Sequence, residues 1–329
     1  MLTYLVRRIA IGVLTLLLIT FVIYGLIRNI PGTPLTVAQN EIDPSKQMSK
    51  ERIKQLEAIY GLDKHWTVAY VQWIGNVLQG DLGRSFSRKQ AVSRIISQRI
   101  GPTLLLSVPS LLLSYLLSIP LGLYCSARAG RTDERVISTL LYVLYSFPAF
   151  VAALFLQLLF AVRLGWLPLF GMVSDHYEQM SLLGKTWDLF LHSFMPVTVY
   201  TYGGLAYGAR FIRSNMQEVM RQDYIRTARA KGLGPVSVVW KHAFRNTLIP
   251  LVTLLGLELP GLLSGSVVIE QIFTWPGMGR QFFESIIERD YPTIMGLTLM
   301  FSVLTLAAQL LADIFYTLVD PRVRLDEKS

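Results

Sequence analysis

Apolar residues along this chain gather in six long runs, separated by polar and often basic stretches. A helix of about 20 apolar residues is long enough to cross the hydrocarbon core of a bilayer. The pattern therefore predicts an all-α integral membrane protein with about six transmembrane helices. The expected spans are Ile9–Arg28, Thr103–Tyr124, Val136–Val162, Ser193–Ile212, Thr247–Ile269 and Thr293–Val319.

The first run, which follows Arg7 and Arg8, could also be a secretory signal peptide. Its apolar core is long for a signal peptide, at about 20 residues. The sequence Arg28-Asn29-Ile30-Pro31 that follows it is not a small-residue cleavage site. We therefore expect an uncleaved first span.

The one long polar stretch, residues 31–98, separates the first two spans. It contains two expected helices, Lys50–Ile59 and the amphipathic Trp66–Leu78. Aromatic side chains on the second helix favour an anchor at the membrane interface over a ligand cage. The expected organisation is an N-terminal helix (1–30), this external segment (31–98), a transmembrane domain (99–320) with a cytoplasmic loop (214–247), and a cytoplasmic tail (321–329).

Composition agrees with a membrane protein, because 52% of residues are hydrophobic and only 16% are charged. The net charge of +9 could indicate a nucleic-acid partner, but the basic residues stand at the ends of the apolar runs. Cys125 is the single cysteine, which excludes an intrachain disulfide and a cysteine-based zinc site. The four histidines show no metal-ligand spacing, so no metal site is expected.

The distribution of basic residues predicts the orientation. Sixteen Lys and Arg residues lie on the side of the N-terminus, against four in the two short loops of the opposite side. Short cytoplasmic loops carry the excess of positive charge, whereas a long segment such as 31–98 translocates largely regardless of its charge. We expect a multi-pass protein of a prokaryotic cytoplasmic (inner) membrane with both termini in the cytoplasm.

Several residues inside the expected spans are candidates for a translocation pathway. Phe147 and Pro148 interrupt the third span, which indicates either a cavity lining or an ordinary proline kink. Tyr200 and Tyr202 lie in the weakly apolar fourth span. Glu258 is an acid within an apolar run, so it should face a cavity or a structural partner.

Two pairs of glycines have the small-xxx-small spacing that allows close helix packing. Gly204 and Gly208 stand in the fourth span, and Gly261 and Gly265 stand in the fifth. We expect these two faces to be packing surfaces between helices.

The stretch Gln222–Pro250 between the fourth and fifth spans carries five basic residues and a single acid, Asp223. Good helix formers over Tyr224–Lys231 are followed by glycines, and a second helical run covers Val236–Leu248. The pattern predicts a short helix, a glycine turn and a second helix at the membrane surface. Charge alone would also fit a loop that only fixes topology.

No Walker motif, catalytic triad or metal constellation occurs in the chain, so the sequence predicts a protein that is not an enzyme. If it transports a solute with the energy of ATP, a partner must hydrolyse the ATP. That partner, rather than this chain, would use ATP and magnesium.

The order of residues in the central loop resembles the EAA loop of ABC-importer permeases. Arg226-Thr227-Ala228 stands at the acid-Ala-Ala triplet, Gly232 at its glycine and Pro250 at the proline of the next helix. The triplet lacks its acid. However, the ten residues Asp223–Gly232 read like the dipeptide/oligopeptide branch, and the resemblance to its B-type permease covers residues 1–324.

The resemblance implies a type I importer fold and a set of partners. These are a second related permease, two cytoplasmic ATPase subunits and an external solute-binding protein. It also implies that the short helix docks on the ATPase, with Ile225 and the neighbouring apolar residues in the contact. The expected coupling residues are Asp223, Tyr224, Arg226, Thr227, Ala228, Arg229, Lys231 and Gly232.

The resemblance implies a pore-forming permease that imports peptides, with nickel chelates, glutathione or microcin-like peptides as alternative substrates. A membrane receptor or scaffold whose basic loop binds anionic lipid is a different class that fits the charges. A secondary transporter is a third class, for which Glu258 alone would have to supply the coupling-ion site.

Overall fold

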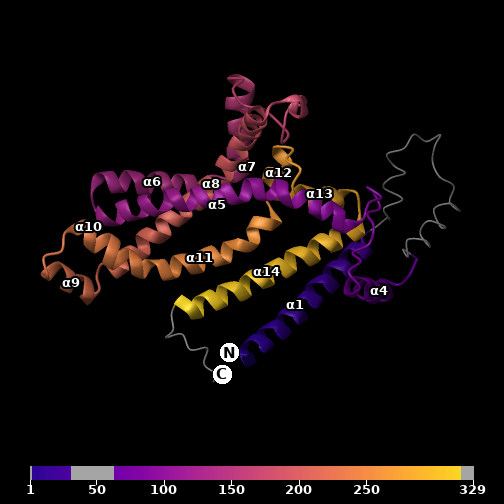
Figure 1. Ribbon diagram of the computed structural model, residues 1–329, viewed down its shortest axis with the longest axis horizontal. Coiled ribbons are helices and arrows are strands. Elements are labelled where there is room, and N and C mark those ends of the chain that lie inside the picture. Colours follow the sequence, from indigo (N-terminus) through magenta and orange to yellow (C-terminus); the bar gives the residue numbers. More distant parts are fainter. Residues whose placement is uncertain (1, 31–62, 320–329) are drawn as a thin grey trace. The chain divides into compact units, whose positions relative to one another are not determined.

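The computed structural model describes residues 2–30 and 63–319, which form helices with no β-strand among them (Figure 1). The expected helix Lys50–Ile59 and the tail 321–329 lie outside the described residues. The larger α-helices are α1 (Leu2–Asn29), α4 (Trp66–Leu78), α5 (Val92–Ala127), α6 (Thr132–Ser146), α7 (Ala149–Leu156), α8 (Leu182–Val219), α9 (Asp223–Ala230), α11 (Arg245–Ser264), α13 (Met278–Ile287) and α14 (Tyr291–Val319). The shorter elements are η2 (Gln157–Arg163), η3 (Tyr177–Gln179), α10 (Pro235–Ser237), η4 (Val238–Phe244) and α12 (Val267–Ile272).

Three of these helices, α1, α5 and α14, are long and apolar enough to cross a membrane. The third expected span is a broken one: Thr132–Ser146 and Ala149–Arg163 are bent by 94° relative to each other. The fourth expected span lies within α8, which has 38 residues. The fifth expected span, Thr247–Ile269, is not one helix: it covers most of α11, whose apolar part is Pro250–Leu259, and continues past a break at Gly265-Ser266 into α12.

Proline explains where the third span breaks. Phe147 adopts an extended conformation (φ −81°, ψ 123°), as a residue before proline prefers. Pro148 has no N–H to continue the hydrogen-bond ladder of α6, and its own backbone is also extended. The interruption at Ser146-Phe147-Pro148 is therefore a full break between two helices rather than a gentle kink.

The chain divides into two compact units. The first unit comprises Met1–Gly101 and Gly277–Ala307, and the second comprises Pro102–Pro276 and Ala308–Ser329. This division departs from the expected order along the chain, because a segment that follows the fifth span belongs with the N-terminal part.

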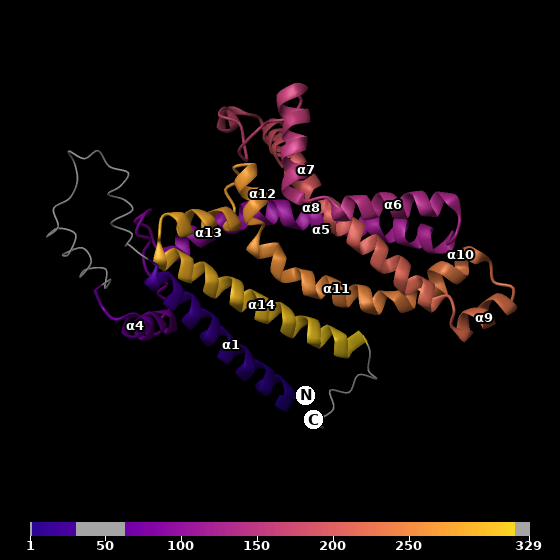
Figure 2. The same cartoon turned by 180° about the vertical axis from the view of Figure 1, so that it is seen from behind.

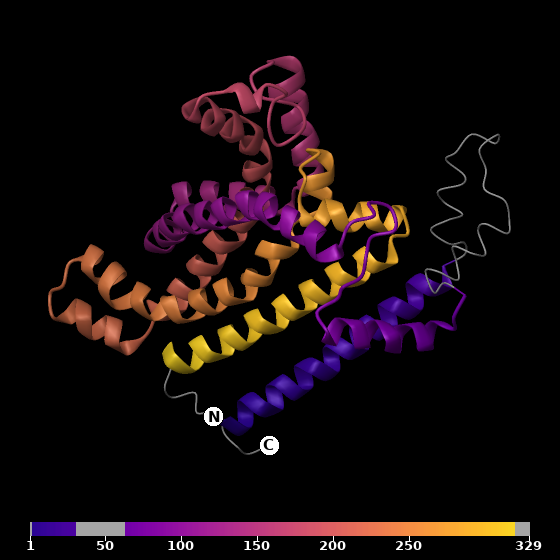
Figure 3. The same cartoon turned by 45° about the vertical axis from the view of Figure 1, so that its right-hand side comes forward.

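In the first unit, α4 packs along α1 (Figure 3). Tyr70 is buried, and its hydroxyl donates to the Leu17 carbonyl at 3.0 Å and lies 2.9 Å from Thr20 Oγ1. The rings of Trp66 and Trp73 pack against aromatic side chains of α1. The expected interfacial anchor at Tyr70 is thus wrong, because this side chain holds α4 on α1.

A buried carboxylate joins the two sequence segments of the first unit. Asp290 is fully buried and precedes α14. It accepts hydrogen bonds from Ser85 Oγ, Phe86 N, Ser87 Oγ and Thr293 Oγ1, over 2.5 to 3.1 Å. Four donors around one carboxylate offset the loss of its hydration, which explains why an acid can lie in this core.

In the second unit, α5, α6 and α8 lie side by side (Figure 1). Small residues recur every four positions on the face of α5 that meets α8: Ser110, Ser114, Ser118 and Gly122. Ser114 Oγ donates to the Thr201 carbonyl of α8 at 3.0 Å. A one-turn repeat of small side chains lets the two backbones approach closely, as is typical of membrane helices.

Candidate functional site

The short helix α9 forms as expected, and its end is well defined. The N–H of Gly232 bonds to the Arg229 carbonyl at 2.9 Å, and the N–H of Leu233 bonds to the Ala228 carbonyl at 3.4 Å. This pair of bonds is a Schellman motif, which requires a residue in the left-handed conformation. Gly232 supplies it with a φ of +78°, so the glycine is needed for its backbone rather than for space.

The helix α9 lies near α10 (Figure 2) and contacts η4, and one of its faces is buried in the second unit. Ile225 is 0% exposed and Ala228 is 5% exposed. We call the cluster around them the α9 core; it consists of Leu123, Ile212, Met216, Ile225, Ala228, Val238, Ala243 and Leu251. The expectation that Ile225 and Ala228 present apolar contact to a partner is therefore wrong, because they anchor α9 to α5, α8 and η4.

The other face of α9 is exposed. Arg226 pairs with Asp223 at 3.3 Å, and both side chains are open to solvent, at 75% and 93% exposure. The hydroxyl of Tyr224 accepts a hydrogen bond from Asn246 Nδ2 at 3.1 Å. Thr227, Arg229 and Lys231 are exposed as well. The outward face is thus polar and mostly basic.

The two tyrosines expected in the pathway form hydrogen bonds with backbone groups at breaks between helices. Tyr202 donates its hydroxyl hydrogen to the Phe147 carbonyl at 2.7 Å, at the break between α6 and α7. The hydroxyl of Tyr200 accepts from the N–H of Ser266 at 2.5 Å, at the break between α11 and α12. Irregular backbone in a membrane requires such partners, so these contacts give both side chains a structural role.

Glu258 is half-buried on α11 and lies beside the hydroxyl of Tyr115 on α5, without good hydrogen-bond geometry. This places it among the interior side chains of the second unit. Both alternatives that the sequence left open, a pathway role and a structural pair, stay predictions.

The two glycine pairs differ. A Cβ on Gly204 or on Gly208 would lie 2.9 Å from the hydroxyl oxygen of Ser114 or of Ser118, so both glycines sit in the α5–α8 contact. By contrast, a Cβ on Gly261 would meet nothing within 4 Å. Gly265 ends α11 with a φ of +68°. A Cβ on Gly265 would lie 3.2 Å from Thr103 Cγ2 and against the Glu270 carboxylate, so of the second pair only Gly265 is closely packed within this chain.

Several buried acids were not anticipated. Glu134 of α6 is 2% exposed and pairs with Arg213 of α8 at 2.7 Å. Glu270 of α12 is fully buried and accepts from Thr103 Oγ1 at 3.0 Å. Their burial was not predictable, because Glu134 stands beside a basic loop and Glu270 stands at the edge of an apolar run.

A further acid, Asp188, lies in the part of α8 that precedes the expected fourth span. Burial raises the pKa of this carboxyl, but hydrogen bonds from the Ser174 hydroxyl and N–H, with His192 nearby, outweigh it and hold the pKa below its usual value. The ionised carboxylate thus fastens the loop before α8.

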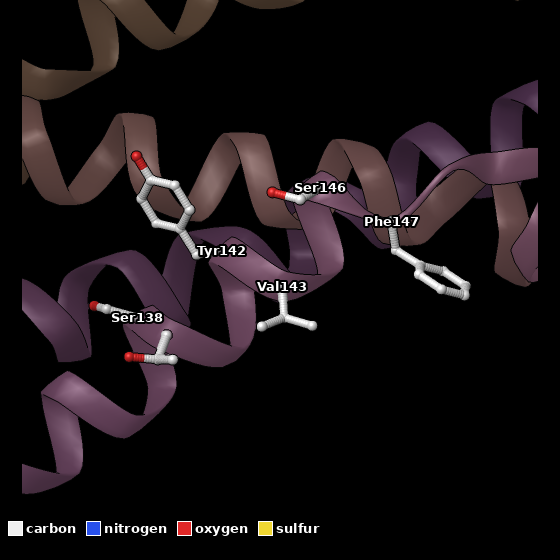
Figure 4. A pocket seen from close by; sticks show the side chains of 6 residues that line it. Ser138, Tyr142, Val143, Ser146 and Phe147 are labelled. Atoms are coloured by element: carbon white, nitrogen blue, oxygen red, sulfur yellow. The ribbon is translucent and has the colours of Figure 1, made fainter.

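The face of the second unit formed by α6 and α8 is hollowed. One pocket of about 620 Å³ lies along α6 up to its break, where Ser138, Tyr142 and Phe147 project from the helix and its C-terminal turn (Figure 4). A second pocket of about 410 Å³ shares Ser138 and Tyr142 and extends to Arg210 and Arg213 of α8. We call the two pockets together the α6–α8 hollow. Within the part of the chain that the structure describes, no group of His, Cys, Asp and Glu could hold a metal ion.

The long apolar helices and the α6–α8 hollow are features of a multi-pass membrane transport protein. The chain belongs to the family described as binding-protein-dependent transport system inner membrane component, whose family model matches residues 118–325. The N-terminal model of the same system matches residues 1–107. This is a family of transport components of the inner membrane and not of enzymes.

Relatives match almost the whole chain. The oligopeptide transport system permease protein AppB of Bacillus subtilis is 38% identical over 324 residues, covering 98% of this chain and 99% of the relative. The di/tripeptide transport system permease protein DppB of Pseudomonas aeruginosa is 36% identical over 337 residues, covering 98% and 99%. The glutathione transport system permease protein GsiC of Salmonella choleraesuis is 35% identical over 325 residues, also covering 98% and 99%.

A solved structure supports the fold. The inward-facing MetNI methionine ABC transporter is similar with a TM-score of 0.53 and 18% identity, covering 69% of this chain and 97% of that chain. At this identity the likeness concerns the fold alone. The expected all-α membrane fold of a type I ABC importer permease is confirmed.

Proposed function

We propose that this chain is the pore-forming permease of an ATP-driven importer of peptides. The names of the relatives AppB and DppB, which match it over nearly its full length, support a peptide substrate. Glutathione, itself a small peptide, is the second candidate, because GsiC is almost equally similar. Nickel chelates and microcin-like peptides remain alternative substrates, which the names of AppB, DppB and GsiC do not mention.

The single observation that carries the coupling mechanism is the two-sided construction of α9. Its basic face is exposed, whereas Ile225 and Ala228 fasten its other face in the α9 core. An ATPase subunit that binds Arg226, Arg229 and Lys231 through acidic side chains would pull on α5 and α8 through that core. The helix thus transmits a movement because it is rigidly packed within this chain.

The importer that we propose has further subunits. ATP and magnesium are used by two cytoplasmic ATPase subunits, and a second related permease completes the pore. The N-terminus, the loop 214–247 and the C-terminus lie in the cytoplasm, with residues 99–320 as the transmembrane domain. The segment 31–98 and the loop 271–292 lie outside, where they meet the solute-binding protein.

The test is charge reversal on the exposed face of α9 in the complete, reconstituted importer. Arg229→Glu should lower both peptide uptake and binding-protein-stimulated ATP hydrolysis by about 10-fold or more, because like charges then face each other. Arg163→Glu, which reverses an equally exposed charge at the end of η2, is the matched control and should leave both rates unchanged.

Co-purification with the ATPase subunits separates coupling from folding. Arg229→Glu should release the ATPase while the permease keeps its melting temperature. In contrast, Ala228→Glu puts a charge into the α9 core and should unfold the loop itself. Uptake and ATPase retention by Arg229→Glu equal to those of the control would refute the proposed role of α9.

A further inference from the structure

Arg210 of α8 lies in the α6–α8 hollow in an unusual setting. Its guanidinium carbon stands 3.9 Å from the ring centre of Tyr142 and 5.1 Å from that of Tyr145. The stack continues, since Tyr145 stacks on Tyr207 and Tyr207 stacks on Phe211, with centroids 6.3 and 6.2 Å apart. Contacts with two aromatic faces hold the guanidinium in a fixed orientation.

Stacking leaves the edge of this guanidinium unused. A guanidinium that packs over an aromatic ring keeps its in-plane N–H donors for other partners. Among the described residues Arg210 makes no hydrogen bond and no ion pair. Arg213, one turn further along α8, is the opposite case, because the buried carboxylate of Glu134 already occupies it at 2.7 Å.

The position of Arg210 in the expected fourth span indicates the surroundings of its side chain. Arg210 stands near the end of the expected fourth span, Ser193–Ile212, where a charge facing lipid costs less than the ~3 kcal/mol of the bilayer centre but still favours polar surroundings. A basic residue is retained at such a position when it faces an aqueous cavity or an anionic group. The hollow, with Ser138, Ser214 and Gln217 around it, provides polar surroundings that lipid tails would not.

We propose that Arg210 binds the carboxylate of the transported peptide during its passage. This inference rests on the proposed function and adds a substrate-binding residue to it. A planar guanidinium with free in-plane donors matches a carboxylate bidentately. The wider pocket along α6, with Val143 and Phe147, offers apolar walls for the peptide's side chains. Tyr142 and Tyr145 are positioning residues that keep the donors aimed into the hollow.

The experiment compares a tripeptide with its C-terminal amide in the complete importer in proteoliposomes. Uptake of both is measured at saturating binding protein, and the ratio of acid to amide is the readout. Arg210→Gln should lower that ratio by about 10-fold or more, because a charge-assisted hydrogen bond is lost only for the acid. Arg210→Lys keeps the charge without the fork and should give an intermediate ratio. Arg163→Gln removes an exposed charge elsewhere and should keep the wild-type ratio.

The possible results of this experiment have different consequences for the inference and for the proposed function. An acid-to-amide ratio in Arg210→Gln and Arg210→Lys equal to that of the wild type would overturn the inference and leave the proposed function intact. An equal loss of both substrates that varies with the content of anionic lipid would assign Arg210 to a lipid phosphate and also overturn it. If the wild-type importer moves neither substrate, the proposed function fails and takes the inference with it.

Discussion

The end of α8 and the helix α9 carry basic residues at similar density, yet the surroundings of these side chains differ. In α8, Arg213 bonds to a carboxylate whose side chain is 3% exposed, and Arg210 is stacked between tyrosines. In α9, Arg226 forms only a pair with Asp223 that is open to solvent. Inside the helix packing both basic residues contact defined side chains, whereas on α9 the charges face solvent.

The difference follows from the surrounding dielectric. A charge removed from water must be compensated by hydrogen bonds or an opposite charge, as Glu134 is by Arg213, Ser138 and Gly130. A charge in water needs no partner and gains little from one. Arg213 is therefore a fixed part of this fold, whereas Arg226 on α9 is not held by the packing.

Removal of one partner from the buried pair should have the largest effect on stability. Arg213→Gln leaves the Glu134 carboxylate buried with only two remaining donors and should destabilise the protein by about 2–3 kcal/mol, at the lower end for buried pairs since Arg213 is one-third exposed. Thermal unfolding of the purified protein measures this loss of stability. The double variant Glu134→Gln/Arg213→Gln should recover much of the loss; if both variants melt alike, the pair is not the cause.

The close contact of α5 with α8 should be the next most sensitive feature. A Cβ on Gly122 would lie 2.7 Å from Ile212 Cβ and 2.8 Å from the Ala209 carbonyl oxygen. Gly122→Ala should therefore cost about 1–3 kcal/mol through overpacking. Gly203→Ala, on α8 with open space around it, should be neutral or slightly stabilising. Melting temperatures that move in the same direction for both variants would contradict this packing.

A smaller and more local effect is expected at the end of α9. Gly232→Ala forces a side chain into the left-handed conformation at a cost of about 1–2 kcal/mol. Gly234→Ala, two residues later and without a positive φ, is the matched control. Hydrogen exchange of the peptide 222–234 should be faster in the first variant only, and equal exchange in both would exclude the Schellman end.

The smallest effect should come from the exposed pair. Asp223→Asn and Arg226→Gln each remove an ion pair that is 75% to 93% exposed, so neither should change the melting temperature measurably. ATPase binding should nevertheless weaken in Arg226→Gln. A clear loss of stability in either variant would show that α9 uses its charges internally, as α8 does.

Much of the fold could be predicted from local patterns. Long apolar runs gave α1, α5 and α14, and the change from helix formers to glycine gave the end of α9. The proline at position 148 marked the break of the third span, although its 94° bend was not predictable. That angle depends on contacts of α7 with α8 and α12, which lie far along the chain.

The candidate site was predictable only in part. The basic character of α9 and the position of Gly232 were read from the sequence. Which face of α9 is buried was not, because Ile225 and Ala228 are equally suited to an external partner and to the α9 core. Arg210 was not singled out because in the sequence it is one more basic residue near the end of the expected fourth span, and only packing brings Tyr142 and Tyr145 of α6 over it.

The sequence by itself determined what depends on neighbouring residues: the membrane class, the helices, their ends and the family. The tertiary structure alone decided which polar groups face one another across helices. It assigned Tyr200 and Tyr202 to broken backbone, joined Ser85 to Asp290, and separated the occupied Arg213 from the available Arg210. The physical reason is that helix formation is local in the chain, whereas the desolvation of a buried charge is settled by whichever distant side chain packs against it.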